Sequence, residues 1–236
     1  PDVTLDDGDS VTRELAPGAG YTVVEDDPAA LGYALTDVSC MDNQAGTSYQ
    51  VNLANRQVDF TGAPGLVASC TFTNTLLGSI VITKVTQPSS SESFGFTGDL
   101  GAFSLKDGES RRIENVVPGS YSVTEYWPGS DVLLSSIRCD DGGSATPSVA
   151  ILDRRTATVN VDPGETVSCT FDNVEKDTVI IRKGTRPAGD SQTDFAFSSN
   201  LPGAGAFTLK NGGLISVTGV IPGQAYTVSE GDPTPG

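Results

Sequence analysis

The sequence predicts an all-β chain made of tandem antiparallel β-sandwiches. Short runs rich in Val, Ile, Thr, Tyr and Phe alternate with turn residues, and the 236 residues include 27 Gly and 14 Pro. This spacing is typical of strands joined by tight turns. An internal repeat of sandwich size gives the second indication, and no amphipathic helical pattern longer than a turn or two competes with it. We expect about seven strands in a complete repeat.

The repeat is carried by short motifs that return after about 100 residues, the size of one sandwich domain. Each aromatic strand that follows a Pro-Gly turn ends in Glu, and the cysteines recur as two pairs. The repeated stretches are Phe103–Gly108 with Phe207–Gly212 and, more loosely, Val3–Gly8; Tyr21–Glu25, Tyr121–Glu125 and Tyr226–Glu230; Ser69–Asn74 with Ser168–Asn173; and Ile80–Lys84 with Val179–Lys183.

These motifs predict three repeats. Residues 1–76 form a partial repeat without its first strands, 77–176 a complete β-sandwich, and 177–236 a partial repeat without its last strands. Two interpretations of the incomplete repeats are open. The sequence is an excerpt from a longer array, or neighbouring copies supply the missing strands at an open sheet edge. We favour the first, because residues 205–236 would otherwise duplicate what 1–36 provide.

Composition excludes several classes of function. The net charge of −16 opposes binding to nucleic acid or to an anionic membrane. Histidine is absent, which excludes Ser-His-Asp and Cys-His catalysis and imidazole-bound zinc within this segment. No apolar stretch is long enough to span a membrane, and the start of the sequence lacks a signal-peptide pattern. We expect no cofactor, no metal, no membrane insertion and no enzymatic turnover in this segment.

Three polar residues fall on faces that are otherwise apolar. Side chains at i and i+2 share a face of a strand, so Lys84, Glu125 and Asn173 each lie at the end of an inward-facing apolar row. The rows are Ile80 and Ile82 before the Lys, Tyr121 and Val123 before the Glu, and Val167, Cys169 and Phe171 before the Asn. The corresponding residues of the partial repeats are Glu25, Asn74, Lys183 and Glu230.

Burying a Lys and a Glu is costly unless they are paired or used. One interpretation is a buried ion pair with an amide beside it. The other is an isopeptide bond between the Lys84 amine and the Asn173 carboxamide. Desolvation leaves the amine neutral and nucleophilic, and the same apolar site keeps Glu125 protonated, so that it polarises the amide and transfers protons as ammonia leaves. The pattern alone leaves both interpretations open.

The stretches Gly78–Lys84, Pro118–Glu125 and Thr170–Asn173 resemble the prealbumin-like B-type repeats of collagen-binding adhesins and the SpaA-type backbone pilins of Gram-positive bacteria. The resemblance implies an Ig-like sandwich in which Lys84 bonds to Asn173 with Glu125 as the catalytic residue. It also implies that Glu25 and Asn74 await a Lys from outside the segment or from a neighbouring subunit, and that Lys183 and Glu230 lack their Asn. The cysteines, and Trp127 after the Glu, depart from the better-known members.

The four cysteines form two pairs with identical spacing, Cys40 with Cys70 and Cys139 with Cys169. We expect one disulfide per pair in an oxidising, extracellular setting, the alternative being reduced core thiols. A loop of this length stabilises a domain by about 3–4 kcal/mol in the chain-entropy model. Two acidic stretches, 6–9 and 140–143, raise the question of calcium. They lack the EF-hand spacing, and Asp-Gly favours turns.

These observations predict a structural module of an extracellular cell-surface stalk, pilus or filament. Its expected partners are neighbouring repeats or copies of itself, and its expected chemistry is limited to autocatalytic cross-linking. The alternative is an adhesin that contacts a host protein or glycan through its loops. That alternative requires exposed loop aromatics, for which the candidates are Tyr49, Tyr126 and Trp127.

Overall fold

The computed structural model describes residues 2–46, 48–126, 129, 131–186 and 192–232. It is built almost entirely from β-strands, with short 3₁₀ turns at η1 (Pro28–Leu31), η2 (Leu53–Asn55) and η3 (Leu152–Arg154). No helix in these residues is long and apolar enough to cross a membrane.

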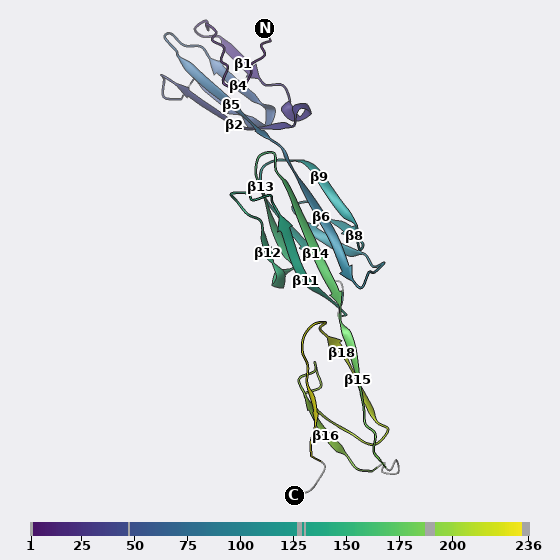
Figure 1. Cartoon of the computed structure of the whole chain (residues 1–236). Helices are drawn as coiled ribbons and strands as arrows, with labels where there is room; N and C mark the ends of the chain where they lie inside the picture. The colour runs from purple at the N-terminus through teal and green to yellow at the C-terminus, as the bar shows by residue number, and fades with distance from the viewer. Residues whose placement is uncertain (1, 47, 127–128, 130, 187–191, 233–236) are drawn as a thin grey trace. The chain divides into compact units, whose positions relative to one another are not determined.

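The chain divides into two compact units, which are described separately (Figure 1). The first comprises residues 1–79, 114–118 and 162–165, and the second contains the remaining residues. The predicted repeat boundaries at 76/77 and 176/177 stay a prediction.

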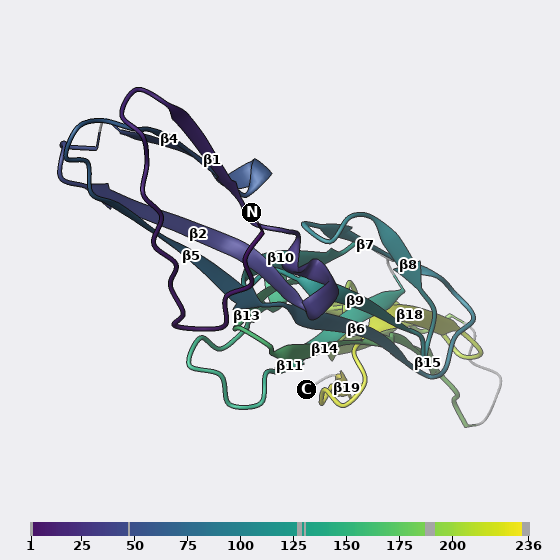
Figure 2. The same cartoon turned by 90° about the horizontal axis from the view of Figure 1, so that it is seen from above.

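The N-terminal strands form two sheets. Strands β1, β4 and β3 are ordered β1-β4-β3, and β2 pairs with β5 in an antiparallel ribbon that both views show (Figures 1 and 2). Val58 is completely buried and Val38 nearly so. The strand bounds are β1 Gly20–Val24, β2 Tyr33–Asp42, β3 Tyr49–Asn52, β4 Gln57–Thr61 and β5 Ala68–Leu76.

Residues 2–19 contain no strand, although Val3–Gly8 loosely repeats Phe103–Gly108. In the middle repeat this motif forms β8 (Phe103–Leu105), which pairs with β7 (Phe94–Gly98). The described residues 2–46 and 48–76 contain no counterpart of β7, so within them the backbone of the N-terminal copy has no such ladder to join. The sequence motif therefore forms a strand only where its partner is present.

The middle repeat contains two larger sheets, ordered β12-β13-β10-β7-β8 and β11-β14-β6-β9. Within residues 77–176, apart from 127, 128 and 130, nine strands are present rather than about seven, because short turns divide the apolar runs. The remaining bounds are β6 Gly78–Gln87, β9 Ser110–Val116, β10 Gly119–Glu125, β11 Val132–Asp140, β12 Val149–Ile151, β13 Thr156–Val161 and β14 Thr166–Glu175.

Aromatic side chains join these two sheets into a sandwich. The ring of Phe96 on β7 stacks on Phe103 at 5.0 Å between centroids, and it meets Phe171 on β14 edge to face at 5.2 Å. Alternate residues of β6 and β14 are buried, as the period-two pattern predicts. Ile80, Ile82, Val123, Val167 and Phe171 are completely buried.

Both predicted cysteine pairs are bonded in the structure. Cys40–Cys70 joins β2 to β5, and Cys139–Cys169 joins β11 to β14. Each pair occupies directly opposed positions of its antiparallel ladder. The disulfides therefore connect neighbouring strands of one sheet rather than the two layers of a sandwich.

The C-terminal strands repeat the pairing of the first strands of the middle repeat, β6 to β10. Strand β15 pairs with β18, and β16 lies between β17 and β19. Phe197 stacks on Phe207 as Phe96 does on Phe103. The bounds are β15 Asp177–Arg182, β16 Phe195–Ser199, β17 Ala206–Leu209, β18 Leu214–Val220 and β19 Val228–Glu230. Their core contains Leu201, Ala204, Val217 and Val220.

Candidate functional site

The backbone of Lys84 is held on both sides by the turn that precedes β9. Its N–H donates to the carbonyl of Glu109 at 3.0 Å, and its carbonyl accepts from Gly108 at 2.9 Å. Lys183 makes the same pair of bonds with Gly213 and Gly212, at 3.0 and 2.9 Å. The turn therefore fixes the strand position from which each lysine side chain leaves the backbone.

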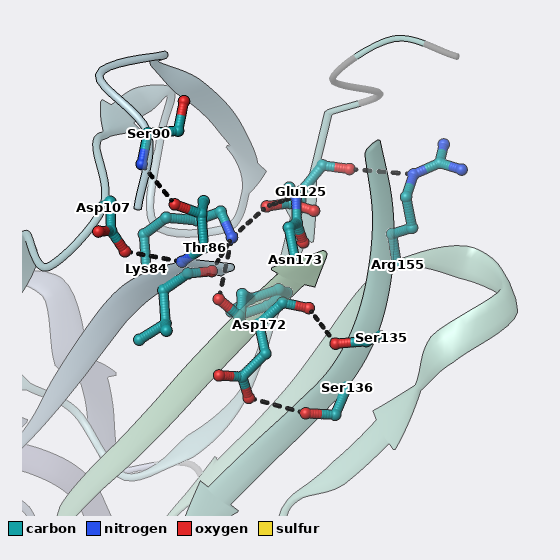
Figure 3. Close-up of polar contacts among 12 residues, drawn as sticks. Lys84, Thr86, Ser90, Asp107, Glu125, Ser135, Ser136, Arg155, Asp172 and Asn173 are labelled. Carbon is teal, nitrogen blue, oxygen red and sulfur yellow. Dashed lines mark hydrogen bonds and ion pairs between the residues drawn. The ribbon is translucent and has the colours of Figure 1, made fainter. Parts of the chain in front are cut away.

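The Lys84 side chain is completely buried, as its place on the apolar face of β6 predicts. Its Nζ lies 3.4 Å from Oε1 of Glu125 and donates to the carbonyl oxygens of Val85 and Phe171 at 2.7 and 3.0 Å (Figure 3). Nζ also lies 4.5 Å from the centroid of the Phe94 ring. The amine is thus surrounded by one carboxyl group, two carbonyls and an aromatic face.

Glu125 and Asn173 complete the predicted group of three, and both are completely buried. Asn173 Nδ2 donates to Glu125 Oε1 at 3.2 Å, the same oxygen that faces Lys84 (Figure 3). The structure therefore brings together Lys84 from β6, Glu125 from β10 and Asn173 from β14.

An irregularity of β11 lies opposite the asparagine. The register shifts between Leu134, which pairs with Asn173, and Ser136, which pairs with Asp172. The Ser135 hydroxyl, on the extra residue, donates to the Asp172 carbonyl at 2.9 Å. Such bulges redirect side chains beside functional sites. The N-terminal copy has the same shift between Leu35 and Asp37, opposite Asn74, so the feature belongs to the repeat.

Two buried oxygens of the group have no hydrogen-bond partner among the described residues: Oε2 of Glu125 and Oδ1 of Asn173. A carboxylate and an amide oxygen are both acceptors, so neither can satisfy the other. Protonation of Glu125 turns one of its two oxygens into a hydrogen-bond donor. Leaving such atoms unpaired in a core is costly, which favours the protonated form of Glu125.

The electrostatics of the site point the same way. Burial lowers the pKa of Lys84 from its ordinary value, against the opposing attraction of Glu125. Burial likewise raises the pKa of Glu125, against the opposing charge of Lys84. Both shifts reduce charge, because desolvation disfavours the ionised forms. Both shifts are therefore in the direction of a neutral amine and a neutral carboxylic acid.

The partial repeats each hold two of the three groups. Asn74 Nδ2 donates to Oε1 of Glu25 at 2.6 Å, and Asn74 is exposed. Lys183 Nζ lies 2.7 Å from Oε1 of Glu230 and 4.0 Å from the centroid of the Phe195 ring. The Lys-Glu and Glu-Asn contacts of the middle repeat are thus reproduced where two partners are present.

The aromatic ring under each lysine was not among the predicted site residues. Phe94 and Phe195 occupy equivalent strand starts, β7 and β16, and each ring faces the amine of its own repeat. Alignment of the two repeats would have revealed this pair, because Ser-Phe-Gly-Phe and Asp-Phe-Ala-Phe coincide at both aromatic positions.

The acidic stretches form turns, as the sequence predicts. Asp9 N–H donates to the Asp6 carbonyl at 2.9 Å, and Gly142 N–H donates to the Asp140 carboxylate at 3.1 Å. The Asp141 carboxylate accepts from Ser148 N–H at 2.6 Å. These carboxylates are engaged by backbone amides of their own loops.

Comparison with solved structures finds distant similarity to bacterial proteins. An adhesin from Mobiluncus mulieris, described as containing intramolecular disulfide, isopeptide and ester bond cross-links, matches 56% of this chain and 55% of its own at 18% identity and a TM-score of 0.35. The match to the Bacillus anthracis TIE protein covers 82% of this chain and 36% of that protein, at 17% identity and a TM-score of 0.31. The match to a streptococcal ancillary pilin covers 76% of this chain and 66% of the pilin, at 11% identity and a TM-score of 0.28.

The chain spans about half the length of the Mobiluncus adhesin. No curated protein sequence matches it. The family model of the SpaA-type prealbumin-like fold domain matches residues 2–76 and again 80–175, which together are well over half of the chain. The two matches coincide with the N-terminal strands and the middle sandwich. The chain therefore belongs to the family of prealbumin-like fold domains.

Proposed function

We propose that this chain is a structural module of an extracellular stalk, pilus or filament, and that it resists force because an isopeptide bond between Lys84 and Asn173 closes its middle repeat. The family places the chain among prealbumin-like modules, and two disulfides fit an oxidising environment. Expected partners are other repeats or copies of the same protein. The chemistry is self-modification without turnover.

In the bond-forming step, the neutral Nζ of Lys84 attacks Cγ of Asn173. A new C–N bond forms, the C–Nδ2 bond breaks, and Glu125 transfers the amine proton to the leaving nitrogen, which departs as ammonia. The net change is the loss of one ammonia, and no oxidant or cofactor takes part. Asn173 lines a pocket of about 240 Å³, and we propose that the ammonia leaves into it.

The observation that carries this proposal is the pair of unpartnered oxygens, Glu125 Oε2 and Asn173 Oδ1, beside a buried amine. An ion pair without chemistry would leave both oxygens as acceptors without a donor. A protonated Glu125 supplies that donor, and the same proton polarises the amide for attack. The arrangement that satisfies the core is thus also the reactive one.

Mechanical unfolding tests the force-bearing role. When the chain is pulled from its ends, the bond transmits force from Lys84 directly to Asn173, so the segment between them stays folded. In E125Q the bond does not form, so the residues between Lys84 and Asn173 extend. The loop that the Cys139–Cys169 disulfide closes is the exception, because it stays closed until reduction. Reduction then releases the 30-residue loop of the middle repeat, which adds about 100 Å. Reduction of Cys40–Cys70 adds a similar length in every variant and in the unsubstituted chain. Single-molecule force spectroscopy measures these lengths.

The matched control is E114Q, which makes the same change at an exposed position of β9. It should extend no further than the unsubstituted chain, with or without reductant. Full extension of the middle repeat in the unsubstituted chain would contradict the proposed role.

A pH dependence follows from the raised pKa of Glu125. In K84M the carboxyl group loses its cation but stays buried, so its folded pKa remains above the ordinary 4.5. Its stabilising contribution is then complete below pH 4.5 and is lost as pH rises through the folded value, by at most about 1.4 kcal/mol per pH unit. Urea unfolding between pH 4 and 8, followed by the fluorescence of Trp127, the only tryptophan, measures this.

The double variant K84M/E125Q is the control for the pH series. It lacks the titrating group and should show no decline over the same range. If the free energy of unfolding of K84M is as independent of pH as that of this control, burial does not penalise the ionised form of Glu125. That result would contradict the neutral Lys84–Glu125 pair.

One surface supports the adhesin alternative. An open groove of about 460 Å³ is lined by Phe96, Phe103 and Tyr126, and Tyr126 is 72% exposed. Aromatic faces of this kind bind apolar or sugar surfaces. Of the other predicted loop aromatics, Tyr49 is engaged, since its hydroxyl donates to the Cys40 carbonyl at 2.8 Å. Trp127 lies outside the described residues.

A glycan array probed with the chain and with Y126A tests this alternative. The adhesin role requires binding that falls at least about ten-fold when the exposed ring is removed, the loss of about 1.4 kcal/mol expected for one good contact. No signal, or equal signals from both proteins, would count against glycan recognition by this groove.

A further inference from the structure

We propose that Arg155 is a positioning residue for bond formation: it holds the peptide unit of Glu125 so that the carboxyl group faces Lys84 and Asn173. The inference rests on the proposed function, since it concerns the reaction of the same site. The proposed role of Arg155 is exercised through Glu125.

Arg155 holds Glu125 through two hydrogen bonds. The N–H of Glu125 donates to the Arg155 carbonyl at 2.9 Å, and Arg155 Nε donates back to the Glu125 carbonyl at 3.3 Å (Figure 3). The register of β10 and β13 ends one residue earlier, at Thr124 and Thr156. The Arg155 backbone carbonyl makes one bond of a further pair at the position that carries the carboxyl group, and the Arg155 side chain supplies the other.

The left-handed backbone conformation of Arg155 indicates that the arginine side chain has a role. Its φ is +54°, in the left-handed region, where it ends the η3 turn by donating its N–H to the Leu152 carbonyl. Only glycine adopts this conformation without steric cost. An arginine here is therefore less favourable for the turn than glycine, unless its side chain makes a compensating contact. The bond to Glu125 is such a contact.

The N-terminal repeat has the same arrangement. Arg56 has a φ of +53° at the end of η2. Its carbonyl accepts from Glu25 N–H at 2.9 Å, and its Nε donates to the Glu25 carbonyl at 3.3 Å. Between Leu53 and Arg56 the sequence reads Ala-Asn, whereas the middle repeat has Asp-Arg. The turns of the two repeats therefore differ at both intervening residues but share the arginine.

The charge of Arg155 does not explain its presence. The positive guanidinium lowers the pKa of Glu125, in opposition to the burial that raises it. A cation placed for its charge would thus work against the protonated acid that the reaction needs. The geometric contribution remains, because catalytic groups displaced by even about 1 Å react up to a hundred-fold more slowly.

The test compares R155G with R154G. Both variants remove one arginine side chain from the same turn, but only R155G removes the Nε bond to the Glu125 carbonyl. The backbone bond from Glu125 N–H to residue 155 is kept in both, and glycine suits the backbone at 155. The whole chain is made by cell-free synthesis at several pH values, quenched with acid at intervals, and weighed by intact mass to follow the loss of ammonia. We expect R155G to react roughly ten- to hundred-fold more slowly even at its own pH optimum, and R154G to react like the unsubstituted chain. R155K, which keeps a cationic donor, should recover part of the rate.

Equal rates for R155G and R154G would overturn the proposal. So would a shifted pH optimum with an unchanged maximal rate, which would assign Arg155 a role through its charge. Failure of the unsubstituted chain to lose ammonia is a different result, because it removes the proposed function itself. If R155G loses its fold in circular dichroism, R155Q, which keeps an N–H donor, is compared with R155M, which has none. Equal rates for that pair would also overturn the proposal.

Discussion

The burial of an amine, a carboxyl group and a carboxamide in one apolar sandwich is the constraint on which the middle repeat depends. Lys84, Glu125 and Asn173 are all completely buried, and a core of this kind tolerates charge only at high cost. Loss of charge through a proton on Glu125 lowers that cost. In the proposed reaction the neutral amine that results is the nucleophile and the amide is its target, so the demands of stability and of reactivity would coincide.

The rest of the fold serves to hold the three groups in place. The groups come from strands β6, β10 and β14, which belong to both layers of the sandwich. A turn fixes the backbone of Lys84 on both sides, and a bulge in β11 lies opposite Asn173. The Cys139–Cys169 disulfide acts on the same strand as the asparagine, because it ties β14 to β11. Strand β14 therefore carries both the disulfide to β11 and the asparagine of the proposed isopeptide bond.

The sequence was sufficient to predict the all-β fold and the meeting of Lys84, Glu125 and Asn173, because alternation along a strand determines which face a side chain occupies. It did not predict that residues 2–19 lack strands, since strand formation depends on a partner rather than on the local motif. The bulge beside Asn173 and the left-handed Arg155 were also missed. Both are properties of the backbone, which residue types other than glycine do not reveal.

The intact mass of the purified chain, before and after reduction, tests the central claim most directly. The account predicts a deficit of about 17 Da for the ammonia lost from the middle repeat, which persists on reduction, together with two hydrogens per disulfide that return on reduction. Peptide mapping should place the first deficit on a fragment that contains both Lys84 and Asn173. A reduced chain of unmodified mass would contradict the account and would leave Lys84 and Glu125 as a buried pair beside an unreacted amide.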